Sequence, residues 1–457
     1  MGKTKFGMIK NKFMKINKLL SVFLLLITTI ASAQEKWSFD QCLEYAREHN
    51  LQILASRLNE QAQMYNYKMA RNQALPDLNA SLNTGFTFEP ELFTNSTDYQ
   101  YTKLYQNNGT LSASVLLSNM GNLNLNKKKN LLLFQQNQFA TDKAINDISL
   151  QLTGDYLTIL LNKELLNIDL SAMEINKELV GKNEKLYKAG SIALSSLYEA
   201  RANLATAKQD YENMKIEVER ARLNLAILLQ KDYYDFDIQD VRISDDIQMP
   251  LINIDNIIDY AFENQPEIKA AELGAEAAKK DIRIAQTAKS PSVTMNYQAS
   301  TSYSNILNLP VDNEKMSKQW DNNHSQSLML GINIPIFNKG INSLKVQQAK
   351  IMENLQSNNL EQSKLILKQT IQSAYFDVSS SYQSFLAAKE AAKSTGLSFD
   401  YAQKSFDAGK IAIYDLNIAR NNYFTAQSQM VQAKYNFLFK LKILEFYEGI
   451  PLKISGL

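Results

Sequence analysis

The chain has 457 residues, of which 45% are hydrophobic and 21% are charged, a composition that excludes intrinsic disorder as its overall state. One cysteine and two histidines exclude an intrachain disulfide framework and leave little for zinc or for histidine-based catalysis. The net charge of +2 includes six lysines in the first 33 residues, so the remainder is weakly acidic and unsuited to nucleic-acid binding.

Residues 1–33 have the pattern of a secretory signal: a lysine-rich start, an apolar stretch over residues 19–30 and a small-x-small cleavage site at the end. We therefore expect the mature chain to begin near Gln34. Translation from Met14 also gives a signal of normal length, so the start stays open between Met1 and Met14. A membrane anchor is the alternative, but the apolar stretch is shorter than the ~20 residues that a spanning helix needs.

The rest of the chain reads as a tandem duplication, with a first repeat over residues 34–247 and a second over 248–457. Residues near the start of the first repeat recur 215 positions later, and those in its second part recur 219 positions later. The second offset pairs Ala189-Gly190-x-Ile192 with Ala408-Gly409-x-Ile411. The same order of elements is therefore predicted in both repeats: helix, strand, strand, long helix, helix.

Each repeat opens with an amphipathic helix, predicted over residues 38–75 and 254–289, that ends before a proline. Two segments of about ten residues with apolar and polar residues in alternation then follow in each repeat, and this is the length of a tilted membrane strand. The polar segments 89–108 and 304–323 between these strands are expected to be loops in water. We expect the apolar face of the strands to contact lipid, represented by Leu78, Leu82, Val115, Met295, Leu330 and Ile332.

Long helices are predicted over residues 122–187 and 341–406, each 66 residues and therefore roughly 100 Å long. Their apolar residues recur every seven positions, which is typical of helices that wind around each other in a left-handed coiled coil. A second helix returns after each of them. A compact globule does not have such dimensions.

Four strands per chain form a sheet whose edges cannot stay unpaired in hydrocarbon, so closure into a barrel requires several copies. Three copies give 12 strands and 12 helices. The polar face of the strands predicts a water-filled lumen that the helices prolong. The fold class expected is thus a mixed α and β membrane protein, with four strands per chain in a β-barrel that several copies close and that a long α-helical coiled-coil barrel continues.

The duplicated order, the passage 335–340 from the last strand into a long helix, and the paired turns 187–192 and 406–411 resemble the TolC-like outer membrane efflux protein family over nearly all of the mature chain. The resemblance implies a homotrimer with a trimeric 12-stranded β-barrel in the outer membrane, continued by a long α-helical coiled-coil tunnel in the periplasm. It implies a periplasmic adaptor (membrane fusion) protein and an inner-membrane pump of RND, ABC or MFS type as partners. The channel would serve a tripartite efflux or type I secretion system passively, with no catalytic activity, cofactor or metal.

By this resemblance, the two turns form the tip that docks to the adaptor, with Ala189, Gly190, Ser191, Ile192, Ala408, Gly409, Lys410 and Ile411 as the contact residues. Asp415 matches an acidic residue that narrows the pore entrance in the family, whereas Ile418 replaces the second acidic residue. This departure puts a cation-selective constriction in doubt. Tyr414, Arg201 and Arg420 are further candidates for holding the tip shut.

Two other classes of protein remain as alternatives at this stage. A periplasmic adaptor would need one helical hairpin with flanking small domains, and a coiled-coil scaffold without a pore would not be found in membranes. An enzyme is the least favoured class, since no catalytic triad, metal cluster or phosphate-binding loop stands out. The cargo stays open among drugs, metals, peptides and proteins.

Overall fold

The computed structural model describes residues 36–92, 99–234, 236–308, 312 and 314–454, so the predicted signal lies outside the described part. After a short strand β1 (Lys36–Trp37), the first helix, α2 (Phe39–His49), begins at Ser38. The Ser38 hydroxyl accepts a hydrogen bond from the Gln41 N–H, and the Gln41 side chain accepts one from the Ser38 N–H. This capping box satisfies two backbone donors that a helix start would otherwise leave open.

The prediction of a single helix over residues 38–75 is wrong. The helix is interrupted at Asn50, which separates α2 from α3 (Leu51–Asn72). Asn50 has an extended backbone, and its side-chain oxygen accepts hydrogen bonds from the N–H groups of Gln52 and Ile53. Its side-chain nitrogen donates to the Leu228 carbonyl at 2.9 Å. The side chain thus caps α3 and fixes the break against another helix.

The matching helix of the second repeat, predicted over residues 254–289, is broken at the equivalent place into α6 (Ile254–Asn264) and α7 (Pro266–Thr287). Gln265 between them has an extended backbone, with φ −70° and ψ 130°. Pro266 disfavours the helical conformation in its predecessor and suits the first position of the next helix. This break was therefore readable in the sequence.

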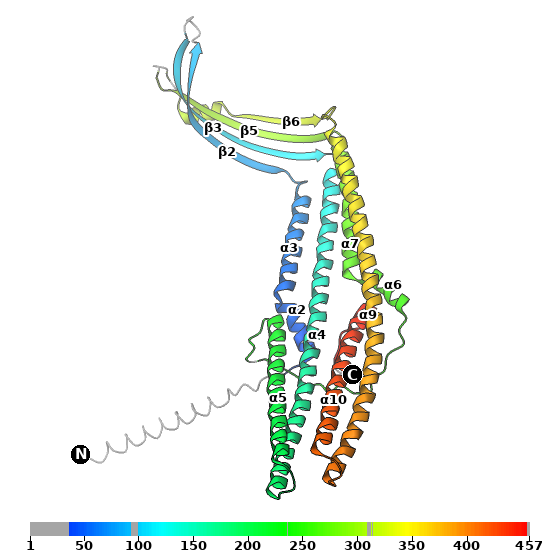
Figure 1. Ribbon diagram of the computed structural model, residues 1–457. Coiled ribbons are helices and arrows are strands. Elements are labelled where there is room, and N and C mark those ends of the chain that lie inside the picture. The colour runs from blue at the N-terminus through cyan, green and yellow to red at the C-terminus, as the bar shows by residue number, and fades with distance from the viewer. Residues whose placement is uncertain (1–35, 93–98, 235, 309–311, 313, 455–457) are drawn as a thin grey trace, which may run out of the picture. The chain divides into compact units, whose positions relative to one another are not determined.

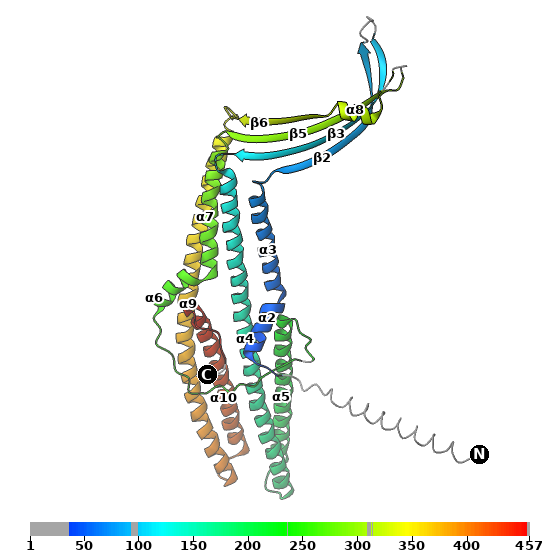
Figure 2. The ribbon, with the colours of Figure 1, turned by 180° about the vertical axis from the view of Figure 1, so that it is seen from behind.

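Four antiparallel strands form one sheet in the order β2-β3-β5-β6, and Figure 1 shows them side by side. Their bounds are β2 (Asp77–Leu92), β3 (Tyr99–Ser118), β5 (Ser292–Ile306) and β6 (Ser325–Asn333). In the described residues β2 pairs only with β3, and β6 pairs only with β5, so both edges of the sheet are open; Figure 2 shows the two edge strands from behind.

The two segments expected to be loops are largely structured. Pairing of β2 with β3 continues from Asp77↔Ser114 to Leu92↔Tyr99, through most of residues 89–108. The polar composition of these segments suggested loops, but tyrosine and threonine favour strands. Pairing in a hairpin also satisfies the backbone hydrogen bonds regardless of side-chain polarity. In residues 304–323, β5 extends to Ile306 and a short helix, α8 (Met316–Asn322), follows.

The predicted long helices are confirmed to within one residue at their ends: α4 (Asn122–Lys188) and α9 (Ile341–Asp407) have 67 residues each. The returning helices, α5 (Leu194–Leu229) and α10 (Ile413–Glu448), have 36 residues each. The heptad positions Ile371, Val378 and Phe385 are all 0% exposed, as a coiled-coil seam requires. None of the helices in the described ranges has an apolar stretch long enough to cross a membrane.

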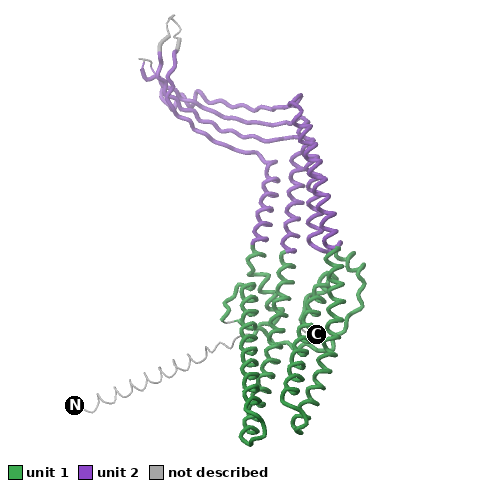
Figure 3. The backbone as a smooth tube through the Cα atoms, in the orientation of Figure 1, with its two compact units in different colours: residues 1–54, 144–261, 368–457 green, residues 55–143, 262–367 purple. Residues whose placement is uncertain are grey.

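The contacts divide the chain into two compact units, shown in Figure 3, and both repeats contribute to each. Unit 1 comprises residues 1–54, 144–261 and 368–457, and unit 2 comprises residues 55–143 and 262–367. The sheet lies within unit 2. Each long helix has residues in both units.

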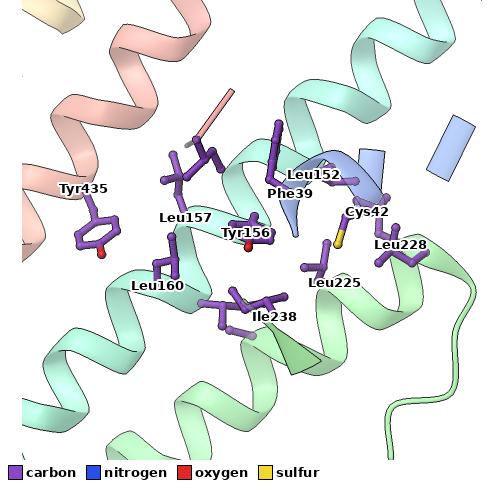
Figure 4. Packing of buried hydrophobic residues seen from close by; sticks show 14 of the residues in the cluster. Phe39, Cys42, Leu152, Tyr156, Leu157, Leu160, Leu225, Leu228, Ile238 and Tyr435 are labelled. Atoms are coloured by element: carbon purple, nitrogen blue, oxygen red, sulfur yellow. The ribbon is translucent and has the colours of Figure 1, made fainter. Parts of the chain in front are cut away.

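The main apolar core of unit 1 surrounds Tyr156 of α4, as Figure 4 shows. Tyr156 is fully buried, packs edge-on against Phe39 and donates a hydrogen bond to the carbonyls of Trp37 and Gln239. Because these carbonyls belong to β1 and to the chain beside β4 (Asp237–Ile238), one side chain ties helix α4 to the small parallel sheet.

The segment between α5 and α6, described over residues 230–234 and 236–253, forms a strap that ion pairs hold to other parts of unit 1. Lys163 of α4 lies 3.2 Å from Asp237 and 2.7 Å from Asp240. Lys36 also pairs with Asp240 at 2.7 Å, and Lys389 of α9 lies 3.7 Å from Asp246. Burial alone would raise the pKa of Asp240, but the hydrogen bonds from Lys163 and Lys36 outweigh it and hold this pKa below its usual range.

Candidate functional site

The turn between α4 and α5 reverses the chain through a left-handed glycine. Gly190 has φ +72°, and its N–H donates to the Tyr187 carbonyl at 2.9 Å. The next residue, Ser191, donates to the Leu186 carbonyl, also at 2.9 Å. These two bonds form a Schellman motif, which closes a helix C-terminus and favours glycine at this position.

The turn between α9 and α10 repeats this geometry 219 residues later. Gly409 has φ +69°, and its N–H donates to the Phe406 carbonyl at 2.9 Å. Lys410 donates to the Ser405 carbonyl at 2.9 Å. A Cβ added at Gly190 or Gly409 would meet no atom within 4 Å, so backbone conformation rather than space selects glycine at both tips.

Ion pairs connect the helices next to the two tips. Arg201 of α5 donates to Glu184 of α4 at 2.7 Å, and Lys182 of α4 pairs with Asp407 of α9. The hydrogen bond from Arg201 lowers the pKa of Glu184, and those from Lys182 and Gln403 lower the pKa of Asp407. Both carboxylates are exposed, so water screens these pairs.

A further contact joins α10 to α5 one turn beyond the tip. The buried Asn417 donates its side-chain N–H to Glu199 at 2.9 Å, while its side-chain oxygen has no hydrogen-bond partner among the described residues. One turn along α10, Arg420 is only 2% exposed, and its Nη1 likewise has no partner there. Burial lowers the pKa of Arg420, and the charge of Glu199 partly opposes this.

The four residues predicted at the pore constriction therefore occupy different environments. Tyr414 and Asp415 are exposed at the start of α10. Arg201 and Arg420 are equivalent in the repeat, but the first is bound to a carboxylate on the surface whereas the second is buried. Arg420 lines a polar hollow of about 610 Å³ between α4, α5 and α10, together with Asp169 and Asp210.

Sequence reasoning missed the partners of these residues: Lys182, Glu184, Glu199, Asp407 and Asn417. The offset of 219 contained a signal, because Glu184 and Glu199 correspond to Gln403 and Ile418 and the repeats therefore differ in charge next to the tips. In the described residues, no group of three His, Cys, Asp or Glu side chains is arranged to hold a metal ion.

The sheet separates apolar from polar residues by face. Cross-strand partners share a face, and Val115, Met295 and Leu330 are direct partners across β3, β5 and β6. The other residues predicted to face lipid lie on this same face, through their pairing with Ala113, Gly109 and Val293: Leu78, Leu82 and Ile332. The register thus places all six on one side of the sheet.

The opposite face is polar and largely uncharged. It carries amide and hydroxyl side chains in direct cross-strand pairs, such as Asn83 with Asn108 and Asn79 with Ser112. Further members of this face are Ser81, Thr110, Ser114, Asn296, Gln298, Ser300, Ser302 and Ser327. Burial of these polar side chains in lipid would cost free energy, so this face is suited to contact with water.

The model of the outer membrane efflux protein family matches residues 42–229 and again residues 257–447. The chain belongs to the outer membrane efflux protein family. It is thus an outer-membrane efflux channel and a non-enzymatic transporter, which confirms the class of function, the location and the lack of enzymatic activity expected from the resemblance.

Individual relatives are distant in sequence and similar in fold. Outer membrane protein TolC of Escherichia coli (strain K12) is 22% identical over 442 residues, covering 93% of this chain and 84% of that protein. The structure of CusC matches with a TM-score of 0.77 at 18% identity, covering 90% of this chain and 92% of that chain. The CmeC outer membrane channel of Campylobacter jejuni has a TM-score of 0.77 at 16% identity, covering 90% and 85%. These matches confirm the predicted combination of four strands and long helices.

Proposed function

We propose that three copies of the chain close a 12-stranded barrel in the outer membrane. The observation that carries this proposal is the two-faced sheet with open edges at β2 and β6. An open edge in hydrocarbon leaves backbone donors and acceptors unpaired at a cost of several kcal/mol each, and pairing of β2 with β6 of the next copy removes that cost. The apolar face then contacts lipid, and the amide and hydroxyl face lines a water-filled lumen.

The helices extend this lumen into the periplasm and end at the two glycine turns. We assign Ala189–Ile192 and Ala408–Ile411 to docking of a periplasmic adaptor protein, which connects the channel to an inner-membrane pump of RND, ABC or MFS type. The open space next to Gly190 and Gly409 supports close approach of a partner backbone. Substrates then move passively, and the pump supplies the energy of a tripartite efflux or type I secretion system.

The pore entrance lies next to these turns in this proposal. Tyr414 and Asp415 are exposed and project from the first turn of α10, so they are the residues assigned to narrowing the entrance. Arg201 and Arg420 act behind them: Arg201 holds α4 and α5 together through Glu184, and Arg420 lies next to the contact between α5 and α10.

Disulfide trapping tests the closure of the barrel. In a Cys42→Ala background, Ala80→Cys on β2 is combined in turn with Gln326→Cys, Leu328→Cys or Leu330→Cys on β6. At least one pair is expected to give covalent trimers in outer membranes under oxidising conditions. As a matched control, Ala113→Cys on the inner strand β3 replaces Ala80→Cys and is expected to give none.

Conductance measurements complete the test. Purified full-length protein added to a planar bilayer is expected to open stable channels, because the polar face of each sheet lines a continuous aqueous path. A monomeric rod without conductance and without cross-links between β2 and β6 would reject the proposal in favour of a scaffold without a pore.

A further inference from the structure

Basic residues concentrate where the helices of unit 2 meet the sheet. Within residues 66–76, 119–130, 281–291 and 334–346 there are nine lysines and arginines and a single acidic residue, Asp281. We name these nine residues the basic collar: Lys68, Arg71, Lys127, Lys128, Lys129, Arg283, Lys289, Lys339 and Lys345. The rest of the mature chain has an excess of acidic residues, so the collar is a local feature and not a consequence of overall composition.

The collar lies close to the helix-side ends of the strands. Lys289 is three residues before β5, Lys339 is six residues after β6, and Lys127 is five residues into α4. These positions are three to nine residues from the nearest strand, which places them within roughly 20 Å of the sheet along the chain. Lys129 forms an ion pair with Asp281 at 2.7 Å, whereas Lys127, Lys128, Lys339 and Lys345 have exposed side chains.

The apolar face of the sheet continues directly into the collar. Beyond the end of β6, Ile334 and Ile336 keep the two-residue spacing of Leu330 and Ile332, and Ile336 is 94% exposed. Phe337 follows with 83% exposure, two residues before Lys339. A large exposed apolar segment bordered by lysines is the composition of a membrane interface, where rings and chains contact acyl groups and cations contact phosphates.

The position of Lys128 on α4 places it on the exposed side of the helix, away from α7. Asn126 and Asn130 donate their side-chain N–H groups to carbonyls four residues earlier, at 3.2 and 2.9 Å, and so form a neutral polar stripe. Lys128 lies two residues from each, which is about 200° around the helix. Asn122, one turn earlier on the same stripe, donates to the Thr287 hydroxyl of α7 at 2.6 Å, so the stripe faces α7 and Lys128 lies on the exposed side of α4 away from α7.

We propose that the basic collar binds the phosphate groups of anionic phospholipids in the leaflet next to the helices. This inference rests on the proposed function, because it requires the sheet to span the membrane. The occupant follows from charge complementarity and from continuity with the lipid-facing surface of the sheet. A lysine near an anionic membrane surface strengthens its partition into that surface by about fivefold. The exposed lysines of the collar, Lys127, Lys128, Lys339 and Lys345 among them, act together on the lipid headgroups.

The experiment compares wild type with a variant that carries Lys127→Gln, Lys128→Gln, Lys339→Gln and Lys345→Gln. Both full-length proteins are reconstituted in vesicles of phosphatidylethanolamine with about one quarter phosphatidylglycerol, and protein-bound lipid is quantified by native mass spectrometry. Wild type is expected to enrich phosphatidylglycerol over the bulk ratio, and the variant to lose most of that enrichment, at least tenfold in relative affinity. Equal enrichment in both proteins would overturn the inference.

Two controls test whether lipid enrichment depends on charge near the membrane and not on total charge or on folding. Lys177→Gln, Lys208→Gln and Lys215→Gln remove exposed lysines from α4 and α5 in unit 1 and are expected to leave enrichment unchanged. Arginine at the four collar positions is expected to restore it. Loss of enrichment with the unit 1 variant as well would also contradict the inference.

Conductance separates this inference from the proposed function. A wild-type protein that neither inserts nor conducts contradicts the proposed function, whereas one that conducts without enriching phosphatidylglycerol contradicts only the collar. If the four-lysine variant changes the ion selectivity of the channel and leaves bound lipid unchanged, the lysines line the lumen and the inference is wrong.

Discussion

The side-chain nitrogen of Lys434 lies 2.8 Å from a carboxylate oxygen of Glu164, although only 1% of the lysine side chain is exposed. The same nitrogen lies 2.8 Å from Asp245 in the strap. One buried ammonium group therefore joins α10 of the second repeat, α4 of the first repeat and the connection between them. Two carboxylates and the adjacent Tyr435 ring compensate for the burial of the charge.

Replacement of Lys434 by alanine is expected to loosen this junction. It leaves Glu164 and Asp245 facing each other without a cation, and breaking a buried pair costs 3–5 kcal/mol, reduced here to about 1–3 kcal/mol because both carboxylates are partly exposed. Limited proteolysis of the strap should become faster, and thermal unfolding should begin at a lower temperature. Lys440→Ala, which removes an exposed pair with Asp377, is the matched control and should have little effect.

The tip glycines give a second prediction. Valine at Gly190 or Gly409 must adopt a left-handed backbone at a cost of about 1–2 kcal/mol, and its side chain fills the space where we place the adaptor. Export should be abolished while trimers persist in the membrane. Asparagine, which tolerates this backbone, should preserve the turn and lose less export. Loss of trimers with valine would instead mean that these glycines are needed for folding.

Regular patterns in the sequence predicted the regular parts of the fold. The seven-residue spacing of Ile371, Val378 and Phe385 predicted a long helix. The structure confirms the bounds of this helix to within one residue and the burial of these three side chains. Alternation likewise predicted which face of the sheet carries Leu82 and Leu330. These signals depend on spacing along one element, so they are independent of the rest of the chain.

Features that depend on a partner elsewhere in the fold were not predicted. Asn50 interrupts the helix both by capping α3 locally and by donating to the Leu228 carbonyl, and the second contact leaves no trace in the local sequence. Arg201 and Arg420 occupy equivalent positions of the two repeats, and their different environments arise from the helices packed around each. Pro266 is the exception, since a proline acts on the residue before it and its effect on Gln265 is local.

Charge on the apolar face of the sheet is expected to impair assembly. Arginine at Leu82, Leu330 or Ile332 should cost roughly 2–4 kcal/mol per site near the middle of the bilayer. The same residue at Asn83, on the polar face, should be tolerated. Heat-modifiable trimers in the outer-membrane fraction provide the measurement, and equal yields for both faces would reject the assignment of inside and outside.

Acid is expected to loosen the tips. The pKa values of Glu184 and Asp407 are lowered in the folded state, so their pairs contribute stability above the ordinary values of 4.5 and 3.8 and lose it as the pH falls through the lowered values. Channel conductance should therefore rise when the pH is reduced below about 4.5. In a variant with Lys182→Gln and Arg201→Gln, the pairs are already absent at pH 7, and this rise should be much smaller. A rise of equal size in the variant would assign the effect to other groups.

The buried thiol of Cys42 reports on the core of unit 1. Burial raises the pKa of Cys42 to about 12, so almost no reactive thiolate exists at pH 8, and the surrounding side chains also exclude reagents. Maleimide labelling of the native protein should be undetectable over hours and complete within minutes in denaturant. Phe39→Ala, which opens the packing next to Cys42, should make native labelling measurable. Rapid labelling of the unmodified native protein would show that α2 separates from the core in solution.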